Sequence, residues 1–462
     1  MTDTAPTDVP SAAPANRYLE GLFAPVHEEI TALDLEVTGS LPVELDGRYL
    51  RNGPNPAGPV DPATHHWFVG DGMVHGVRLR DGRAEWYRNR WVRSRQVAGI
   101  LGVDAAPGET ADQTSLANTN VIGHAGRTFA LVEAGGRPAE LTDELDTVCF
   151  SDLDGTLRHS FTAHPKLDPA TGALHTANYW WQRPDVIDYT VVGPDGRVAH
   201  QVDIAVPGNP MVHDCSITET SFVVYDQACT FDIEAAMGGA TLPYRWNPSY
   251  GCRLGVLPLG GDAEAVHWFD VELGYVFHPI NAFDDGDRVV IDVVRHPKMF
   301  DHDHLGPNEG SPSIWRYVLD RATGRATEAQ LDDRPVEFPR VDERTVGRHH
   351  RFSWAVGLEL ASDGDLSWPS TTLVRHDARS GESAVREFGA GKVVGEAVFV
   401  PRSSDAAEDE GWYLTLVHDA ATDRSDLVVI DGQDWLGEPV ATVHLPVRVP
   451  LGFHGNWVPA TT

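Results

Sequence analysis

Tight-turn signals recur along the chain, and each stands between two short runs that are apolar or that alternate apolar and polar residues. Most signals are an aspartate followed by glycine, a pair that readily adopts the positive φ angles of a two-residue hairpin turn. They are found at Asp46-Gly47, Asp81-Gly82, Asp154-Gly155, Asp195-Gly196, Asp285-Gly286, Thr323-Gly324, Asp363-Gly364, Ser380-Gly381 and Asp431-Gly432. The runs between them include residues 127–132, 288–294, 313–319, 411–417 and 426–430. The pattern predicts an all-β chain built mainly from hairpins.

A long chain of hairpins has to protect the edges of its sheets, as closed barrels, sandwiches and propellers do. The 462 residues would fit about two or three average domains, or one large all-β domain. Four-stranded blades of about 45–60 residues would divide the chain into roughly seven, so a β-propeller is the expected fold. Helical periodicity is scarce, and the two short helices that we expect lie at residues 91–101 and 232–237.

No Gly/Ser-rich linker divides the chain after its first residues. Residues 1–16, rich in Thr, Ala, Pro and Asp, are expected to form a flexible tail, and residues 17–462 a single domain. The tail has neither the basic nor the apolar region of a signal peptide. No apolar run approaches the ~20 residues of a membrane-spanning helix. These features favour a cytoplasmic protein.

Charge and cysteine content exclude several classes of function. The formal net charge of −32 argues against binding to nucleic-acid phosphates, and it permits at most a weak, transient membrane contact. The four cysteines are Cys149, Cys215, Cys229 and Cys252. Because they form no CxxC pair, neither a structural zinc site nor a disulfide framework is expected.

Four of the 21 histidines share a local pattern, in which a small apolar run ends at the histidine and proline, aspartate or glycine follows. They are His164, His213, His278 and His454. Proline favours extended backbone at the residue before it, so this pattern is typical of a strand end. The separations of 49, 65 and 176 residues are close to one, one and three blade lengths. The four imidazoles could therefore meet at the propeller axis and bind iron, copper or zinc; the alternative is four ordinary strand residues.

Three glutamates lie in apolar β-context, where an unpaired carboxylate is costly. They are Glu133, Glu337 and Glu396. A metal-binding histidine commonly donates its second ring N–H to a carboxylate. The three glutamates are therefore candidates to hold imidazole rings in place, and the alternative is that they are edge-strand residues that aid solubility.

Several short motifs follow one another across the chain. In the N-terminal part they are RNGPNP at 51–56, HWFVGDGMVH at 66–75, YRNRWVR at 87–93, ANTN at 117–120 and EAGG at 133–136. Further on they are the segments around His213 and His278, EFPR at 337–340, EAVFVP at 396–401 and GFHGNW at 452–457. In this order, over about residues 30–459, the chain resembles the carotenoid cleavage oxygenase family, which includes carotenoid, apocarotenoid and lignostilbene dioxygenases.

The resemblance implies a seven-bladed β-propeller with a dome of loops and short helices over one face. It implies one Fe(II) per chain, held by His164, His213, His278 and His454. Glutamates would orient three of these rings: Glu133 for His213, Glu337 for His278 and Glu396 for His454. His164 would have no carboxylate partner. Thr119 matches the place where the family puts a side chain near the open iron positions, although on its own it could be an ordinary strand threonine.

The resemblance also implies a dioxygenase that uses O₂, without 2-oxoglutarate or a pterin, to split a conjugated C=C bond into two carbonyl products. Lignostilbene cleavers of the family have a lysine before the first of the three glutamates, which helps to ionise a phenol; this chain has Val132. An apolar residue there favours a small hydrophobic alkene such as a carotenoid or apocarotenoid. A stilbene or phenylpropanoid such as isoeugenol is the first alternative, and a non-enzymatic propeller scaffold is the second. The candidate for an apolar membrane-contact patch is residues 97–103, which could also be a buried part of the dome.

Overall fold

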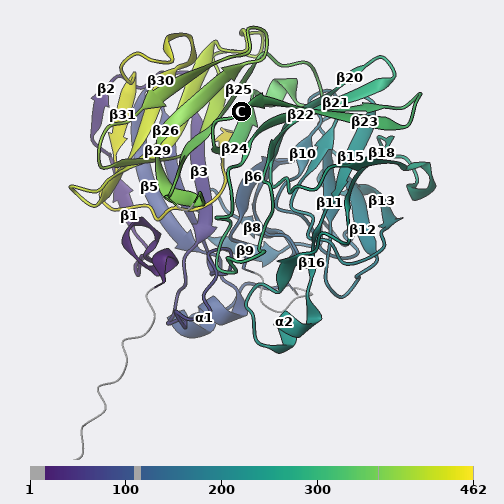
Figure 1. Ribbon diagram of the computed structural model, residues 1–462. Coiled ribbons are helices and arrows are strands. Elements are labelled where there is room, and N and C mark those ends of the chain that lie inside the picture. Colours follow the sequence, from purple (N-terminus) through teal and green to yellow (C-terminus); the bar gives the residue numbers. More distant parts are fainter. Residues whose placement is uncertain (1–15, 109–115, 363, 461–462) are drawn as a thin grey trace, which may run out of the picture.

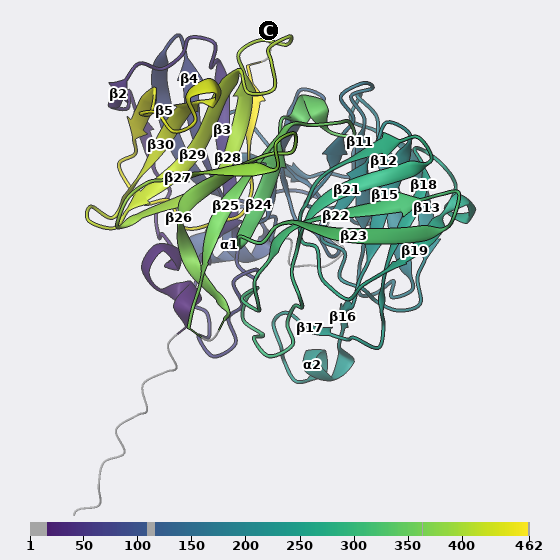
Figure 2. The ribbon, with the colours of Figure 1, turned by 45° about the horizontal axis from the view of Figure 1, so that its top comes forward.

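The computed structural model describes residues 16–108, 116–362 and 364–460. Within them the strands form seven sheets of four or five strands around one axis, which confirms the predicted seven-bladed β-propeller (Figure 1 and Figure 2). Residues 1–15 of the expected tail lie outside the described residues. Asn16, its last residue, is buried, and its side-chain amide donates hydrogen bonds to the carbonyls of Pro62 and His65. Asn16 thus belongs to the packed structure rather than to a tail.

Five blades each contain four strands in the order of the sequence. They are β6 (Asn120–His124), β7 (Arg127–Leu131), β8 (Ala139–Leu141) and β9 (Thr147–Phe150); β10 (Lys166–Leu167), β11 (Leu174–Asn178), β12 (Val186–Val192) and β13 (Val198–Ala205); β14 (Cys215–Ile217), β15 (Ser221–Asp226), β18 (Cys252–Pro258) and β19 (His267–Val271); β20 (Pro279–Asp285), β21 (Arg288–Arg295), β22 (Ser313–Asp320) and β23 (Arg325–Asp332); and β24 (Val336–Val341), β25 (Phe352–Leu360), β26 (Leu366–Asp377) and β27 (Glu382–Glu387). A separate hairpin, β16 (Cys229–Phe231) and β17 (Tyr244–Trp246), is inserted between β15 and β18.

The two remaining blades close the ring with strands from both ends of the chain. One consists of β1 (Thr31–Leu33), β3 (Gly47–Pro54), β4 (Gly72–Arg80), β5 (Arg83–Trp91) and β32 (Gly455–Pro459). The other consists of β2 (Val37–Gly39), β28 (Lys392–Pro401), β29 (Gly411–Asp419), β30 (Arg424–Asp431) and β31 (Ala441–His444). The C-terminal β32 pairs with β3, and the N-terminal β2 pairs with β31. Each pairing covers a sheet edge that would otherwise be open.

The predicted turn pairs have mixed outcomes. Those that join neighbouring strands of one blade are Asp81-Gly82, Asp195-Gly196, Asp285-Gly286, Thr323-Gly324 and Ser380-Gly381, and their glycines have φ angles of 60° to 78°. Two are wrong as hairpin turns: Asp46-Gly47 stands at the start of β3, and Asp154-Gly155 lies in the connection between β9 and β10. Asp431-Gly432 does lie between two paired strands, β30 and β31, but it opens a longer connection with a 3-10 turn at Gly432–Asp434. Asp363 lies outside the described residues.

Two short α-helices, α1 (Arg95–Leu101) and α2 (Ile233–Met237), lie at the same side of the propeller in Figure 1 and form part of a dome. The helix expected at 91–101 starts later than predicted because Trp91 is the last residue of β5. Ser94 then caps α1 by accepting a hydrogen bond from the Val97 N–H at 3.2 Å. Among the described residues, no helix combines the length and the apolar character that a membrane crossing requires.

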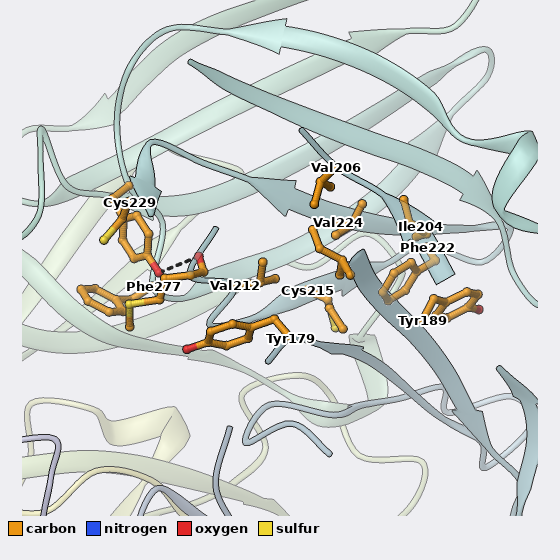
Figure 3. Packing of buried hydrophobic residues seen from close by; sticks show 14 of the residues in the cluster. Tyr179, Tyr189, Ile204, Val206, Val212, Cys215, Phe222, Val224, Cys229 and Phe277 are labelled. Atoms are coloured by element: carbon orange, nitrogen blue, oxygen red, sulfur yellow. Dashed lines mark hydrogen bonds between the residues drawn. The ribbon is translucent and has the colours of Figure 1, made fainter. Parts of the chain in front are cut away.

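Buried side chains lock neighbouring blades together around the axis. In the cluster of Figure 3, Tyr189 of β12 stacks on Phe222 of β15 with ring centroids 4.0 Å apart. Full burial of a side chain of this size contributes about 1.5–3 kcal/mol. Cys215 belongs to the same cluster, and all four cysteines are free thiols. This packing fixes the innermost strand of each blade, on which the functional site depends.

Candidate metal centre

Four histidine side chains meet at the propeller axis, each just before the innermost strand of a different blade. His164 precedes β10, His213 precedes β14, His278 precedes β20 and His454 precedes β32. The predicted strand-end position therefore needs one correction: the histidines stand where the inner strands begin, and the apolar runs before them are not strands. Pro279 opens β20, a position at which a missing N–H is tolerated.

The four rings form a compact, buried cluster. The ring centroid of His164 lies 4.4, 5.2 and 4.4 Å from those of His213, His278 and His454. The candidate ligand nitrogens all lie within 4.8 Å of one another, and the Nε2 atoms of His213 and His278 are 3.1 Å apart. Two ligands at right angles on one ion, with bonds of ~2.1 Å, would be ~3 Å apart. The spacing therefore fits a single metal ion.

The three predicted glutamates stand behind three of the rings. The Nδ1–carboxylate distances are 2.7 Å for His213 and Glu133, 2.6 Å for His278 and Glu337, and 2.9 Å for His454 and Glu396. When Nδ1 donates its hydrogen to a carboxylate, the neutral ring presents an unprotonated Nε2 to the other rings. With both rings in this state, the Nε2 lone pairs of His213 and His278 would face each other at 3.1 Å and repel, and a cation between them would remove the repulsion. The donor set thus fits a resident metal.

Burial and charge set the protonation states that metal binding needs. Burial, reinforced by the neighbouring imidazoles, holds the pKa of His164 well below its ordinary value. Burial also lowers the pKa of His454 to about 3, although Glu396 acts in the opposite direction. For Glu396, burial favours the neutral acid, but Arg340 at 3.3 Å and His454 outweigh it and lower the pKa to about 2. For His213, burial favours the neutral ring, but Glu133 outweighs it and raises the pKa. His164 and His454 are therefore neutral ligands, and Glu396 is an ionised acceptor.

His164 has a different neighbour. The Oδ2 atom of Asp214 lies 3.7 Å from His164 Nδ1, beyond hydrogen-bond distance. The same oxygen accepts a hydrogen bond from the Lys166 ammonium at 2.8 Å. The resemblance implies no carboxylate for His164, whereas the structure places one nearby that is not bonded to it. Asp214 was missed because it directly follows His213 and was interpreted only as a residue that ends a strand.

A cavity of about 870 Å³ opens on the dome side of the histidines. Its wall is mainly aromatic and aliphatic and includes Trp67, Phe68, Val132, Phe277, Phe338 and Phe453. Cavities of this size and character bind small hydrophobic ligands. Thr119 lines this cavity, as do His213, His278 and His454. The Thr119 hydroxyl donates to Asn118 Oδ1 at 2.9 Å, and its carbonyl accepts the His454 N–H at 3.1 Å, so the residue is held beside a candidate ligand.

Exposed apolar residues surround the cavity mouth. Trp181, Ile233 and Met237 line the cavity and are 47%, 61% and 84% exposed. The patch expected at residues 97–103 is only partly at the surface, because Val97 and Ala98 are buried. The mouth was missed because Trp181 and the one-turn helix α2 are distant in sequence and show no shared pattern.

A second cavity, of about 420 Å³, reaches the histidines along the axis. Its wall includes residues of the inner strands β6, β10, β14, β20, β24 and β32. Its lining includes His164, His278 and His454 together with Lys166, Asp214, Arg340 and Glu396. The centre is therefore flanked by a largely apolar cavity and by one that combines apolar and charged side chains.

Fold and site together define a β-propeller metalloprotein with an all-imidazole centre beside an apolar cavity. Comparisons with known proteins agree. A family model described as RPE65, retinal pigment epithelial membrane protein, matches residues 23–459. The chain is 46% identical to the carotenoid cleavage oxygenase of Mycobacterium tuberculosis, with 98% of this chain and 100% of the relative covered. This chain belongs to the carotenoid cleavage oxygenase (RPE65) family.

Two solved structures of relatives have the same fold. The crystal structure of Pseudomonas brassicacearum lignostilbene dioxygenase superposes with a TM-score of 0.85 at 28% identity, covering 97% of this chain and 100% of the other. Cobalt-substituted Synechocystis ACO, an apocarotenoid oxygenase, gives a TM-score of 0.84 at 27% identity, covering 94% and 97%.

Proposed function

We propose that this protein is an Fe(II)-dependent dioxygenase that cleaves a conjugated C=C bond of a carotenoid or apocarotenoid with O₂ and yields two carbonyl products. The observation that carries the proposal is the meeting of four buried imidazoles beside a largely apolar cavity of about 870 Å³. The relatives named for carotenoid and apocarotenoid cleavage support it. We also propose that residues 17–462 work as a single catalytic domain.

The metal would be held by His164, His213, His278 and His454, with Glu133, Glu337 and Glu396 orienting three of the rings. Imidazole nitrogens are suitable ligands for iron. When bound, Fe(II) would supply the activation of O₂. Four neutral ligands leave the full positive charge on the ion, which distinguishes this centre from sites that include a carboxylate ligand.

The cavity wall would place the alkene next to the metal ligands. Phe277 packs edge-on against His213 with centroids 5.1 Å apart, and Phe338 stacks on His278 at 5.5 Å. Both side chains line the cavity, so an apolar chain bound there lies beside the rings and displaces water. Thr119, on the same wall, would limit the space beside the metal.

Tyr244 supplies a polar point in this apolar wall. Its hydroxyl is buried and has no hydrogen-bond partner among the described residues, and burial raises its pKa. A buried donor without a partner is unfavourable until a ligand oxygen accepts from it. This favours an apocarotenoid with an oxygenated end over a pure hydrocarbon.

The mouth residues Trp181, Ile233 and Met237 would receive the substrate from a micelle or membrane. The contact would be weak and transient, because the net charge of −32 repels an anionic surface. Substrate would pass directly from the apolar phase into the cavity that these residues line.

A phenolic stilbene is the second candidate substrate. The structural similarity to the lignostilbene dioxygenase over the whole chain favours it. Val132 opposes it, because this apolar side chain lines the cavity and cannot ionise a phenol.

The test is aerobic incubation of the Fe(II)-loaded protein with a panel of carotenoids, apocarotenoids, resveratrol and isoeugenol, with aldehyde products identified by mass. We expect iron in the purified protein and aldehydes from the polyenes. His278→Ala should lose both, whereas His27→Ala, at an exposed histidine outside both candidate metal-ligand groups, should lose neither. A protein that binds no iron, or retains cleavage in His278→Ala, would overturn the proposal. A non-enzymatic scaffold would show lower stability in His454→Ala and no turnover in any form.

A further inference from the structure

The buried carboxylates near the histidines use their two oxygens to accept hydrogen bonds in two different arrangements. Glu337 accepts from the His278 ring on Oε2 and from His296 Nε2 on Oε1, at 2.8 Å. Glu396 accepts from the His454 ring on Oε1, and Arg340 approaches its Oε2 at 3.3 Å. In both glutamates the second side chain, His296 or Arg340, contacts the oxygen that does not face the metal ligand. The oxygen that faces the metal ligand therefore carries no competing cation, although that of Glu337 also accepts the Phe338 N–H.

Asp214 has the opposite arrangement. Its Oδ1 accepts the Cys215 N–H at 2.6 Å, so Oδ2 is the oxygen that is available to other donors. Lys166 occupies Oδ2 at 2.8 Å, and this is the atom that faces His164 Nδ1 at 3.7 Å. The Asp214 side chain is 2% exposed and therefore depends on the few partners that surround it.

We infer that Lys166 is a positioning residue that withholds Asp214 from His164, so that this ligand, unlike His278 and His454, lacks a carboxylate hydrogen bond. The inference rests on the proposed metal site. A ring with such a bond is better oriented and more basic than one without it. Lys166 thus makes His164 a weaker donor than His278 and His454, and it keeps the metal less tightly bound than it would be if His164 had this bond.

The geometry allows the missing bond to form once the ammonium is removed. The difference between 3.7 Å and a hydrogen bond of about 3 Å is less than one bond length. The Asp214 side chain has to turn Oδ2 only slightly toward His164. Removal of Lys166 should therefore strengthen metal binding, although it breaks an ion pair.

The test compares four variants in the full-length protein loaded with Co(II), whose absorbance is followed during release into excess EDTA. We expect Lys166→Met to slow release about tenfold, the scale on which partners of metal ligands act. Lys166→Arg, which keeps the cation, should release at the wild-type rate. Asp214→Asn, alone or combined with Lys166→Met, should also release close to that rate, because the acceptor carboxylate is gone.

Arg253→Met is the matched control. Arg253 pairs with the buried Asp226 at 2.8 Å in a blade position away from the histidines, and the two side chains are 27% and 0% exposed, close to the 23% and 2% of Lys166 and Asp214. This variant should lower the melting temperature and leave Co(II) release unchanged. If Lys166→Met fails to fold, Lys166→Gln, which loses the charge but keeps a hydrogen-bond donor, should slow release about threefold.

Two results would overturn the inference: unchanged or faster release from the Lys166 variants, or slow release that persists when Asp214 is also replaced. A purely structural ion pair would give the first result, because it stabilises the fold without acting on the ring. If the wild-type protein takes up neither Co(II) nor Fe(II), the proposed function fails instead. The two failures are therefore distinguishable.

Discussion

The two cavities that meet at the histidines are built from different parts of the chain. The dome-side cavity, of about 870 Å³, is walled by loops and short elements such as α2 and the residues around Trp67. The axial cavity, of about 420 Å³, is lined by the inner strands and holds Lys166, Asp214, Arg340 and Glu396. The first is mainly apolar, apart from a few polar groups such as Glu133 and Glu337 beside the rings, and the second combines apolar and charged side chains.

The difference indicates a division of labour. Glu337 and Glu396 lie in inner strands, and the histidines stand next to inner strands, so the backbone ladders of the propeller can hold metal ligands and their partners at constant positions. Loops tolerate substitution, so the dome side can adapt to different alkenes while the metal chemistry is retained. Metal binding and substrate choice should therefore respond to different mutations.

The largest expected effect is on metal binding. Glu396 lines the axial cavity and not the dome-side one. Glu396→Gln weakens the acceptor of His454 and removes the charge beside it, so Fe(II) affinity should fall about 10–100-fold. The ratio of turnover rates for polyene and stilbene should stay the same once the protein is saturated with iron. Anaerobic titration of the apoprotein with Fe(II) measures the affinity, and saturated turnover measures the ratio. Glu343→Gln, at an exposed partner of Arg340, is the control and should change neither. A changed substrate ratio in Glu396→Gln would contradict the division of labour.

The sequence was sufficient to predict the metal-centre side of this comparison. His278 and Glu337 each lie in a distinctive local motif, and the resemblance of these motifs to the family implied their pairing. The spacing of the histidines alone left ordinary strand residues as the alternative. Lys166 and Asp214 could not be paired in this way, because they are 48 residues apart in different blades and neither has a distinctive context. The pairing depends on how two neighbouring inner strands face each other, which local patterns do not encode.

The fold was predictable to a similar extent. Hairpins follow from turn chemistry, as the pair at Asp81-Gly82 shows. The closure of the ring does not, because β2 and β32 join blades at opposite ends of the chain. Asp46-Gly47 looks like a turn in the sequence and instead begins β3, since its partners in that blade are β4 and β32. Long-range strand pairing thus overrides the local preference.

A second prediction concerns the dome side. Val132→Lys places an ammonium in the apolar wall, so cleavage of a polyene should fall about tenfold, because an apolar chain cannot satisfy a buried charge. Cleavage of resveratrol should rise, since the ammonium can stabilise a phenolate. Iron content should not change, and Val132→Leu should retain the wild-type preference. Loss of iron in Val132→Lys would show that the dome side also controls metal binding.

A third prediction tests the polar point of the apolar wall. Tyr244→Phe removes one hydrogen bond worth about 1 kcal/mol, so KM for an apocarotenoid with an oxygenated end should rise about fivefold. KM for a hydrocarbon carotenoid should be unchanged and serves as the internal control. Equal changes for both substrates would indicate that Tyr244 acts by packing rather than by hydrogen bonding.

The smallest expected effect is at the cavity mouth. Met237→Ser removes an apolar side chain that is 84% exposed. Because the variant buries less apolar surface at a vesicle, KM for a polyene supplied in neutral vesicles should rise about two- to threefold. The value of kcat should be unchanged. KM for soluble isoeugenol should not change. Leu436→Ser, at an apolar residue that is 66% exposed and does not line the cavity, controls for general surface hydrophobicity. Ile100→Ser tests the patch at residues 97–103 that the sequence favoured. A larger rise in KM for Ile100→Ser than for Met237→Ser would place substrate uptake at α1. A smaller rise would place it at α2, where exposed apolar residues line the cavity itself.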